Sequence, residues 1–251
     1  MTNYLETVHG RRIAYFKSDG NSPTLVFLGG FKSDMEGAKA KYLEGWARDN
    51  GQSFLRFDYS GHGQSSGMFT DGCIGDWTDD SEAVLEVLTD GPLVLIGSSM
   101  GGWISLLLAK RRPERLSGLL TVAAAPDFTH DSMWPTFSES QKSEIMNKGL
   151  ILLPSEYGDP YPITRKLIED GRNHLVLREP LRFDFPIRML QGSLDNSVTR
   201  ATALKLFDHI EAADIKLSFV KSGDHSFSTV NCLEVIKMNL IDLLNCLNAK
   251  M

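Results

Sequence analysis

The chain has 251 residues, 42% of them hydrophobic, so it is long enough to bury a full core and fits one α/β domain with an insertion better than two domains. Its formal net charge of −6 argues against a nucleic-acid partner, because binding to that polyanion requires a basic surface. No apolar run approaches the roughly 20 residues of a membrane-spanning helix, so we expect no membrane insertion.

The cysteines and the first residues of the chain bear on the cellular compartment in which we expect the protein. The cysteines are Cys73, Cys232 and Cys246, an odd number without a C-x-x-C pair, which predicts free thiols in a reducing environment. The N-terminus shows no charged region followed by an apolar stretch, as a targeting peptide would. We therefore expect a cytoplasmic protein without disulfides.

Short apolar runs alternate with helical patterns along the chain. Residues 5–16, with Gly10 near a turn, predict an opening antiparallel hairpin at a sheet edge. Further strands are expected at residues 24–28, 53–57, 93–96, 119–123, 187–190 and 216–220. Helical spacing marks residues 39–50, 74–88, 102–110, 200–210 and 232–247. This alternation predicts an α/β fold with a mostly parallel central sheet and helices on both faces.

Residues 126–185 interrupt this alternation. They contain two amphipathic patterns, at 138–148 and 162–170, and no evident core strand, so we expect a single domain over residues 1–251 with a small helical cap inserted there. We expect some of its apolar residues to fasten the cap to the core and others to line an acyl pocket. The apolar residues are Phe128, Met133, Trp134, Phe137, Leu152, Leu153, Tyr157 and Tyr161, and Trp134, Phe137 and Leu153 are the pocket candidates.

Residues 93–104 carry the strongest motif, an apolar strand that runs through G-x-S-x-G into an apolar helix. This pattern predicts a nucleophile elbow with Ser99 as the nucleophile, and Gly97 and Gly101 leave space where side chains would collide with neighbouring elements. The alternative is a turn that only packs or that binds a phosphate at the helix N-terminus. A phosphate loop would have a lysine where Trp103 stands.

A serine nucleophile requires a base and an acid, which follow in the order Ser, Asp, His in this architecture. Asp195 ends a strand and glycine turn, and His225 lies on the loop after the next strand, so both reach the carboxyl edge of the sheet. The rival acids are Asp184, Asp214 and Asp224.

Of the other histidines, His62 lies in a glycine-rich loop, where a structural role is expected, and His9, His130, His174 and His209 show no partner spacing. No cluster has the spacing of metal ligands, so we predict no metal and no cofactor.

Stabilisation of a tetrahedral intermediate requires two backbone N–H donors, which form an oxyanion hole. One donor is Met100, the residue after the nucleophile. The second is Phe31, which follows the glycine turn Gly29-Gly30 at the end of the first core strand. The alternative is that the two glycines only turn the chain.

With these assignments the chain resembles the α/β-hydrolase superfamily along nearly its whole length. The resemblance rests on residues 28–31, 56–61, 91–92, 97–103, 186–192 and 224–225. It implies an α/β-hydrolase fold, with Ser99 as nucleophile, Asp195 as acid and His225 as base.

We therefore expect a serine hydrolase that cleaves a carboxylic ester or thioester through an acyl-enzyme, with a small-molecule ester or acyl thioester as its partner. A peptidase or an acyl transferase using the same three residues is the enzymatic alternative, and a non-catalytic small-molecule binding module is the other. The serine at the elbow excludes dehalogenases and epoxide hydrolases, which use a carboxylate there.

Overall fold

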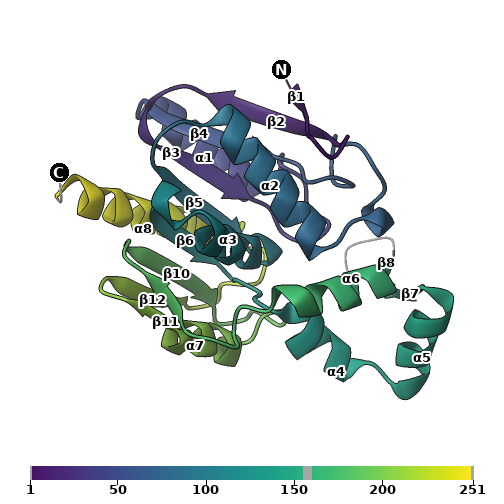
Figure 1. The fold of residues 1–251 in the computed structure, drawn as a ribbon. Helices are drawn as coiled ribbons and strands as arrows, with labels where there is room; N and C mark the ends of the chain where they lie inside the picture. Colours follow the sequence, from purple (N-terminus) through teal and green to yellow (C-terminus); the bar gives the residue numbers. More distant parts are fainter. Residues whose placement is uncertain (1, 155–159, 250–251) are drawn as a thin grey trace.

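The computed structural model describes residues 2–154 and 160–249 (Figure 1). Within these residues the central sheet has eight strands, in the order β1-β2-β4-β3-β5-β6-β10-β12. The strands are β1 (Asn3–Glu6), β2 (Arg12–Ser18), β3 (Asn21–Leu28), β4 (Gln52–Phe57), β5 (Leu93–Ser98), β6 (Leu116–Val122), β10 (Ile187–Gly192) and β12 (Ile215–Val220).

Strand direction follows the sequence pattern. The hairpin β1-β2 is antiparallel at one edge of the sheet, as predicted, and β2 is antiparallel to β4. From β4 to β12 all neighbours are parallel. All six residues of β5 are buried, which explains its continuous apolar run: a central parallel strand is covered on both faces. The mostly parallel α/β sheet is thereby confirmed.

Helices cover both faces of the sheet (Figure 1). On one face, α1 (Ala38–Asp49) and α8 (Val230–Asn248) bury side chains such as Leu43 and Leu240. On the other, α2 (Ile74–Leu88), α3 (Met100–Arg111) and α7 (Arg200–His209) bury Trp77, Ile104 and Leu206. The predicted helices therefore lie close to their expected bounds.

The segment between β6 and β10 holds a π-helical turn η3 (Thr129–Met133), then α4 (Trp134–Thr136), α5 (Glu139–Lys148), β7 (Leu150–Leu153), β8 (Tyr161–Thr164), α6 (Arg165–Gly171) and β9 (Leu181–Phe183), which pairs with β11 (Ile210–Ala212). The expected helix at 138–148 is present as α5, and a capping box between Ser138 and Gln141 fixes its start. Tyr157 lies outside the described residues.

The expected helix at 162–170 is wrong in its first turn. Its first residues belong to β8, which pairs antiparallel with β7 and sets Ile163 opposite Ile151. Both isoleucines are buried, so this pairing stabilises the extended conformation. The helix begins only at Arg165, because the Thr164 side chain accepts a hydrogen bond from the Leu167 N–H and caps it.

Hydrogen bonds close this segment on itself and fasten it to the sheet domain. The buried Asp127 carboxylate accepts hydrogen bonds from the N–H groups of Val176 (2.8 Å) and Leu177 (2.9 Å). These bonds join the start of the segment to the stretch between α6 and β9. The Gly75 N–H donates to Asp170 Oδ2 at 2.8 Å, which ties α2 to α6. The Asp127 bonds therefore close the segment on itself, and the Gly75 bond holds it against the sheet domain.

Candidate active site

Three loops at the carboxyl edge of the sheet bring Ser99, Asp195 and His225 together. Ser99 lies between β5 and α3, Asp195 follows β10, and His225 follows β12. His225 Nδ1 lies 2.9 Å from Asp195 Oδ2, and His225 Nε2 lies 3.0 Å from Ser99 Oγ. A carboxylate can only accept, so Nδ1 carries the hydrogen and Nε2 is free to accept from the serine hydroxyl.

The Ser99 backbone has the left-handed geometry of a sharp turn, with φ 54° and ψ −118°. A Cβ at Gly97 would lie 2.4 Å from both Gly101 O and Ser105 Oγ, and a Cβ at Gly101 would lie 2.2 Å from Leu28 O. Both positions therefore require glycine, because a side chain would push the strand and the helix apart. The turn in this way presents the Ser99 hydroxyl at the sheet edge.

The Asp195 side chain is fully buried and accepts four hydrogen bonds. Oδ1 accepts from the N–H groups of Ser197 (2.9 Å) and Val198 (2.8 Å). Oδ2 accepts from Gln191 Nε2 at 3.0 Å as well as from His225. Burial by itself raises the pKa of Asp195, but the hydrogen bonds from His225, Val198 and Gln191 outweigh it and hold this pKa below its ordinary value. The carboxylate is therefore ionised beside the imidazole.

The rival acids lie elsewhere. Asp214 forms an ion pair with Arg188, at 2.9 Å between Oδ1 and Nη1. Asp224 accepts hydrogen bonds from the Phe227 N–H and the Ser226 hydroxyl in its own turn, and Asp184 is exposed.

Gln191 is a site residue that we did not anticipate from the sequence. The sequence did contain a signal for it, because Gln191 is a polar residue near the end of a strand that is otherwise mostly apolar. In the structure Gln191 is buried, with 1% of its surface exposed.

The two predicted N–H donors flank the serine. Met100 is the residue after Ser99 and starts α3. Phe31 belongs to the loop after β3, which approaches the elbow so closely that a Cβ at Gly30 would lie 3.3 Å from Ser99 Cβ. The role of both N–H groups as oxyanion donors stays a prediction.

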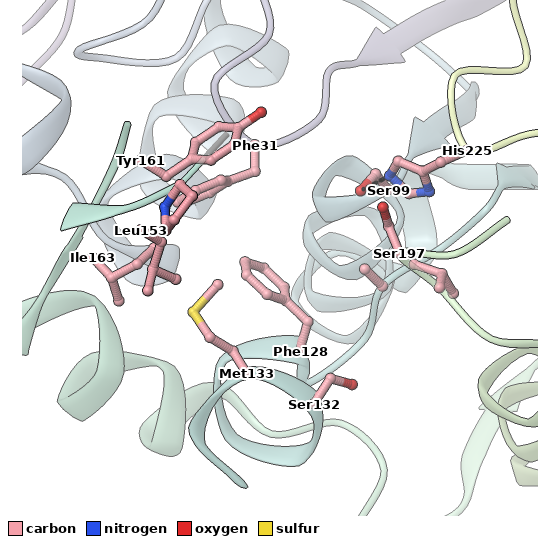
Figure 2. Close-up of a pocket in the computed structure, with 13 residues that line it drawn as sticks. Phe31, Ser99, Phe128, Ser132, Met133, Leu153, Tyr161, Ile163, Ser197 and His225 are labelled. Carbon is pink, nitrogen blue, oxygen red and sulfur yellow. Dashed lines mark hydrogen bonds between the residues drawn. The ribbon is translucent and has the colours of Figure 1, made fainter. Parts of the chain in front are cut away.

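A cavity of about 400 Å³ opens at Ser99 and His225 (Figure 2). Both side chains lie at one end of it, and the opposite end is apolar. Most of the apolar lining comes from the loop after β3, from the start of the inserted segment and from the β7-β8 hairpin, and its larger side chains are Phe31, Phe128, Met133, Leu153, Tyr161 and Ile163. The volume lies in the range of small-molecule sites.

Of the three pocket candidates, Leu153 lines this cavity, whereas Trp134 and Phe137 do not. The Trp134 and Phe137 rings pack on each other, with centroids 6.1 Å apart, and the Arg172 guanidinium lies 5.0 Å from the Trp134 ring centroid. Successive side chains of a helical turn point in different directions, so when Met133 points into the cavity Trp134 points away from it. The sequence predicted an inserted segment here but no helical turn at residues 129–136, so it gave no direction for Met133 or Trp134.

Within residues 2–154 and 160–249, no group of three or more His, Cys, Asp or Glu side chains is placed to hold a metal ion. Within the same ranges, no helix is both long enough and apolar enough to span a bilayer.

Comparisons with known proteins place the chain in a family. Residues 14–144 match the family described as alpha/beta hydrolase fold. The chain is 32% identical to the mitochondrial palmitoyl-protein thioesterase ABHD10 of Homo sapiens over 238 residues, which cover 94% of this chain and 78% of that protein.

Two solved structures are similar over nearly their whole length. A putative hydrolase from Agrobacterium vitis S4 has a TM-score of 0.93 and 35% identity, covering 97% of this chain and 98% of that one. Alpha/beta hydrolase domain-containing protein 10 from mouse has a TM-score of 0.90 and 30% identity, covering 98% and 99%. With this fold, these relatives and the serine elbow, the chain belongs to the alpha/beta hydrolase family.

Proposed function

We propose that this protein hydrolyses carboxylic esters or thioesters through a covalent acyl-enzyme on Ser99. The observation that carries the proposal is the continuous hydrogen-bonded chain from Asp195 Oδ2 through the His225 ring to Ser99 Oγ, with links of 2.9 and 3.0 Å. A serine hydroxyl is a weak nucleophile at neutral pH, and this arrangement supplies the base and the orienting acid that it needs.

In the acylation step, Ser99 Oγ forms a bond to the acyl carbon while its proton passes to His225 Nε2. The negative charge that develops on the carbonyl oxygen is stabilised by the N–H groups of Phe31 and Met100. The tetrahedral intermediate then expels the alcohol or thiol, which takes the proton from His225. Asp195 remains ionised throughout and stabilises the imidazolium.

Deacylation repeats these steps with water. His225 Nε2 takes a proton from a water molecule, whose oxygen bonds to the acyl carbon. Collapse of the second intermediate releases the carboxylic acid and returns the proton to Ser99.

The substrate class follows from the cavity. Among the described residues the lining is mainly apolar and includes no Asp, Glu, Lys or Arg, which suits a hydrocarbon acyl group better than a charged one. The name of the Homo sapiens relative, a palmitoyl-protein thioesterase, supports a long acyl chain and a thioester. We therefore expect acyl esters or thioesters of medium to long chain length to be better substrates than acetyl esters.

The test combines a fluorophosphonate probe with a substrate panel. The parent protein should gain the mass of the probe on the peptide that contains Ser99, and Ser99→Ala should fold normally, gain no mass and lose hydrolysis. A parent that binds acyl compounds without labelling or turnover would be a binding module. Faster cleavage of matched amides than of esters would indicate a peptidase, and preferential transfer to an added alcohol would indicate an acyl transferase.

A further inference from the structure

The loop that carries Phe31 forms a tight turn with a fixed orientation. The Ser33 N–H donates to Gly30 O at 3.1 Å, and the Ser33 hydroxyl donates to the same oxygen at 2.8 Å. Within this turn Lys32 has φ 56°, the left-handed region that L-residues seldom occupy. Gly30 O and the Phe31 N–H belong to one planar trans peptide and point in opposite directions. The bonds from Ser33 therefore orient the Phe31 N–H as well.

A second loop, after β4, holds this turn through three side chains. The Tyr59 hydroxyl donates to Gly29 O at 3.2 Å, and Asp58 Oδ1 accepts from the Met35 N–H at 2.6 Å. Between them His62 Nε2 accepts from the Lys32 N–H at 3.3 Å. The His62 contact fixes the peptide that joins Phe31 to Lys32, which is the peptide on the other side of the proposed oxyanion donor.

The His62 ring is held so that Nε2 can only accept. Ser60 O lies 3.2 Å from Nδ1, so Nδ1 carries the hydrogen and donates it. The ring is buried, 4% exposed, and stands edge-on to Phe69 and Trp77 at 5.1 Å between centroids in each case. Burial lowers the pKa of His62 to about 4, so the ring is neutral at physiological pH.

We infer that His62 is a positioning residue that holds the Phe31 N–H toward the developing oxyanion. It touches no substrate and acts through the Lys32 peptide. The inference rests on the proposed function, because an oxyanion hole matters only if Ser99 attacks an acyl carbon. Loss of the Nε2 acceptor would free the Phe31-Lys32 peptide to rotate away from its left-handed conformation and would weaken one donor of the oxyanion hole.

Two variants separate positioning from packing. His62→Phe keeps a ring of similar size among Phe69 and Trp77 but has no acceptor. His62→Gln places an amide oxygen near the position of Nε2 and can accept from Lys32. Leu240→Ala, fully buried on the opposite face of the sheet, lowers stability without touching the turn and serves as the matched control.

For the best substrate of the panel, we expect His62→Phe to lower kcat roughly tenfold or more with KM within about twofold, since an oxyanion donor acts in the transition state. The affinity for a trifluoromethyl ketone, which forms an oxyanion adduct with the serine, should fall by the same factor. The affinity for the corresponding alcohol, which cannot form that adduct, should stay. His62→Gln should recover most of the lost kcat, and Leu240→Ala should keep its kcat.

Equal kcat in His62→Phe and the parent would overturn the inference, as would a kcat in His62→Gln as low as in His62→Phe. If His62→Phe does not fold, His62→Asn replaces it, because its shorter side chain cannot reach Lys32. These comparisons are made in a protein whose Ser99 labels with the fluorophosphonate. Failure of labelling in the parent would instead count against the proposed function.

Discussion

The side-chain amide of Gln191 lies 3.0 Å from Asp195 Oδ2, the same oxygen that faces His225 Nδ1. The amide also donates to Val198 O at 2.9 Å, so it ties the end of β10 to the loop that carries the acid. We propose that Gln191 holds the Asp195 carboxylate in position beside the imidazole.

We expect Gln191→Met, which keeps the volume of the side chain, to lower kcat about tenfold, the effect of one misplaced hydrogen bond of about 1.4 kcal/mol. Gln191→Glu should be worse, because a second carboxylate beside Asp195 repels it and favours protonation of one of the two. Steady-state kinetics of the two variants tests this. A Gln191→Glu variant as active as the parent would show that Gln191 does not orient the acid.

Asp195→Asn should lower kcat by up to about four orders of magnitude, the effect known for the equivalent change in the serine-protease triad, because the amide favours the wrong imidazole tautomer. Asp224→Asn is the matched control, since the hydrogen bonds that Asp224 accepts from Ser226 and Phe227 lie within its own turn. Initial rates on one ester give the comparison. The assignment of the acid is wrong if Asp224→Asn is the more damaging change.

The free energy of unfolding should fall as the pH falls from 6.5 toward 4, in part because of His62. Burial lowers its folded-state pKa from the ordinary 6.5 to about 4, so between these values the unfolded chain binds a proton that the folded protein does not. Each pH unit in this window removes up to about 1.4 kcal/mol, about 3 kcal/mol in total, and below pH 4 this contribution no longer changes.

Urea unfolding at several pH values measures this effect, with His62→Gln as the reference. Asp58 and Asp80 accept hydrogen bonds from residues of the same loop and titrate in both proteins, so their contributions cancel in the difference. The parent should show the steeper dependence on pH. Parallel curves for the two proteins would contradict a buried neutral His62.

Much of the fold could be predicted from the sequence, because its signals are local. The apolar run of β5 indicates that this strand is buried, and the glycines around Ser99 indicate close contact of the backbone with neighbouring elements. Chain order and strand ends then indicated Asp195 and His225, which the structure brings to hydrogen-bonding distance.

The inserted segment was harder to predict, because tertiary pairing overrides its local pattern. Ile163 fits a helical spacing, yet its pairing opposite Ile151 makes it part of β8. The direction of Trp134 depends on how η3 is set against the sheet domain, and periodicity carries no information on that. His62 contacts Lys32, which is 30 residues away in the sequence, so no spacing rule identifies that contact. Gln191 contacts Asp195 only four residues along the chain, but across a loop whose conformation the sequence pattern does not give.

Chain-length preference gives the sharpest test of the cavity. Leu153 lines its apolar end, so Leu153→Trp should fill part of the space that a long acyl chain would occupy. Each buried methylene contributes about 0.8 kcal/mol, a factor of about four, when its binding energy is realised in the transition state. In the parent, kcat/KM should therefore rise with acyl length and then level off. In Leu153→Trp it should level off earlier, with acetyl esters spared. Trp134→Ala, outside the lining, is the control and should keep the parent profile. The same length profile in Leu153→Trp as in the parent would mean that the acyl chain binds elsewhere.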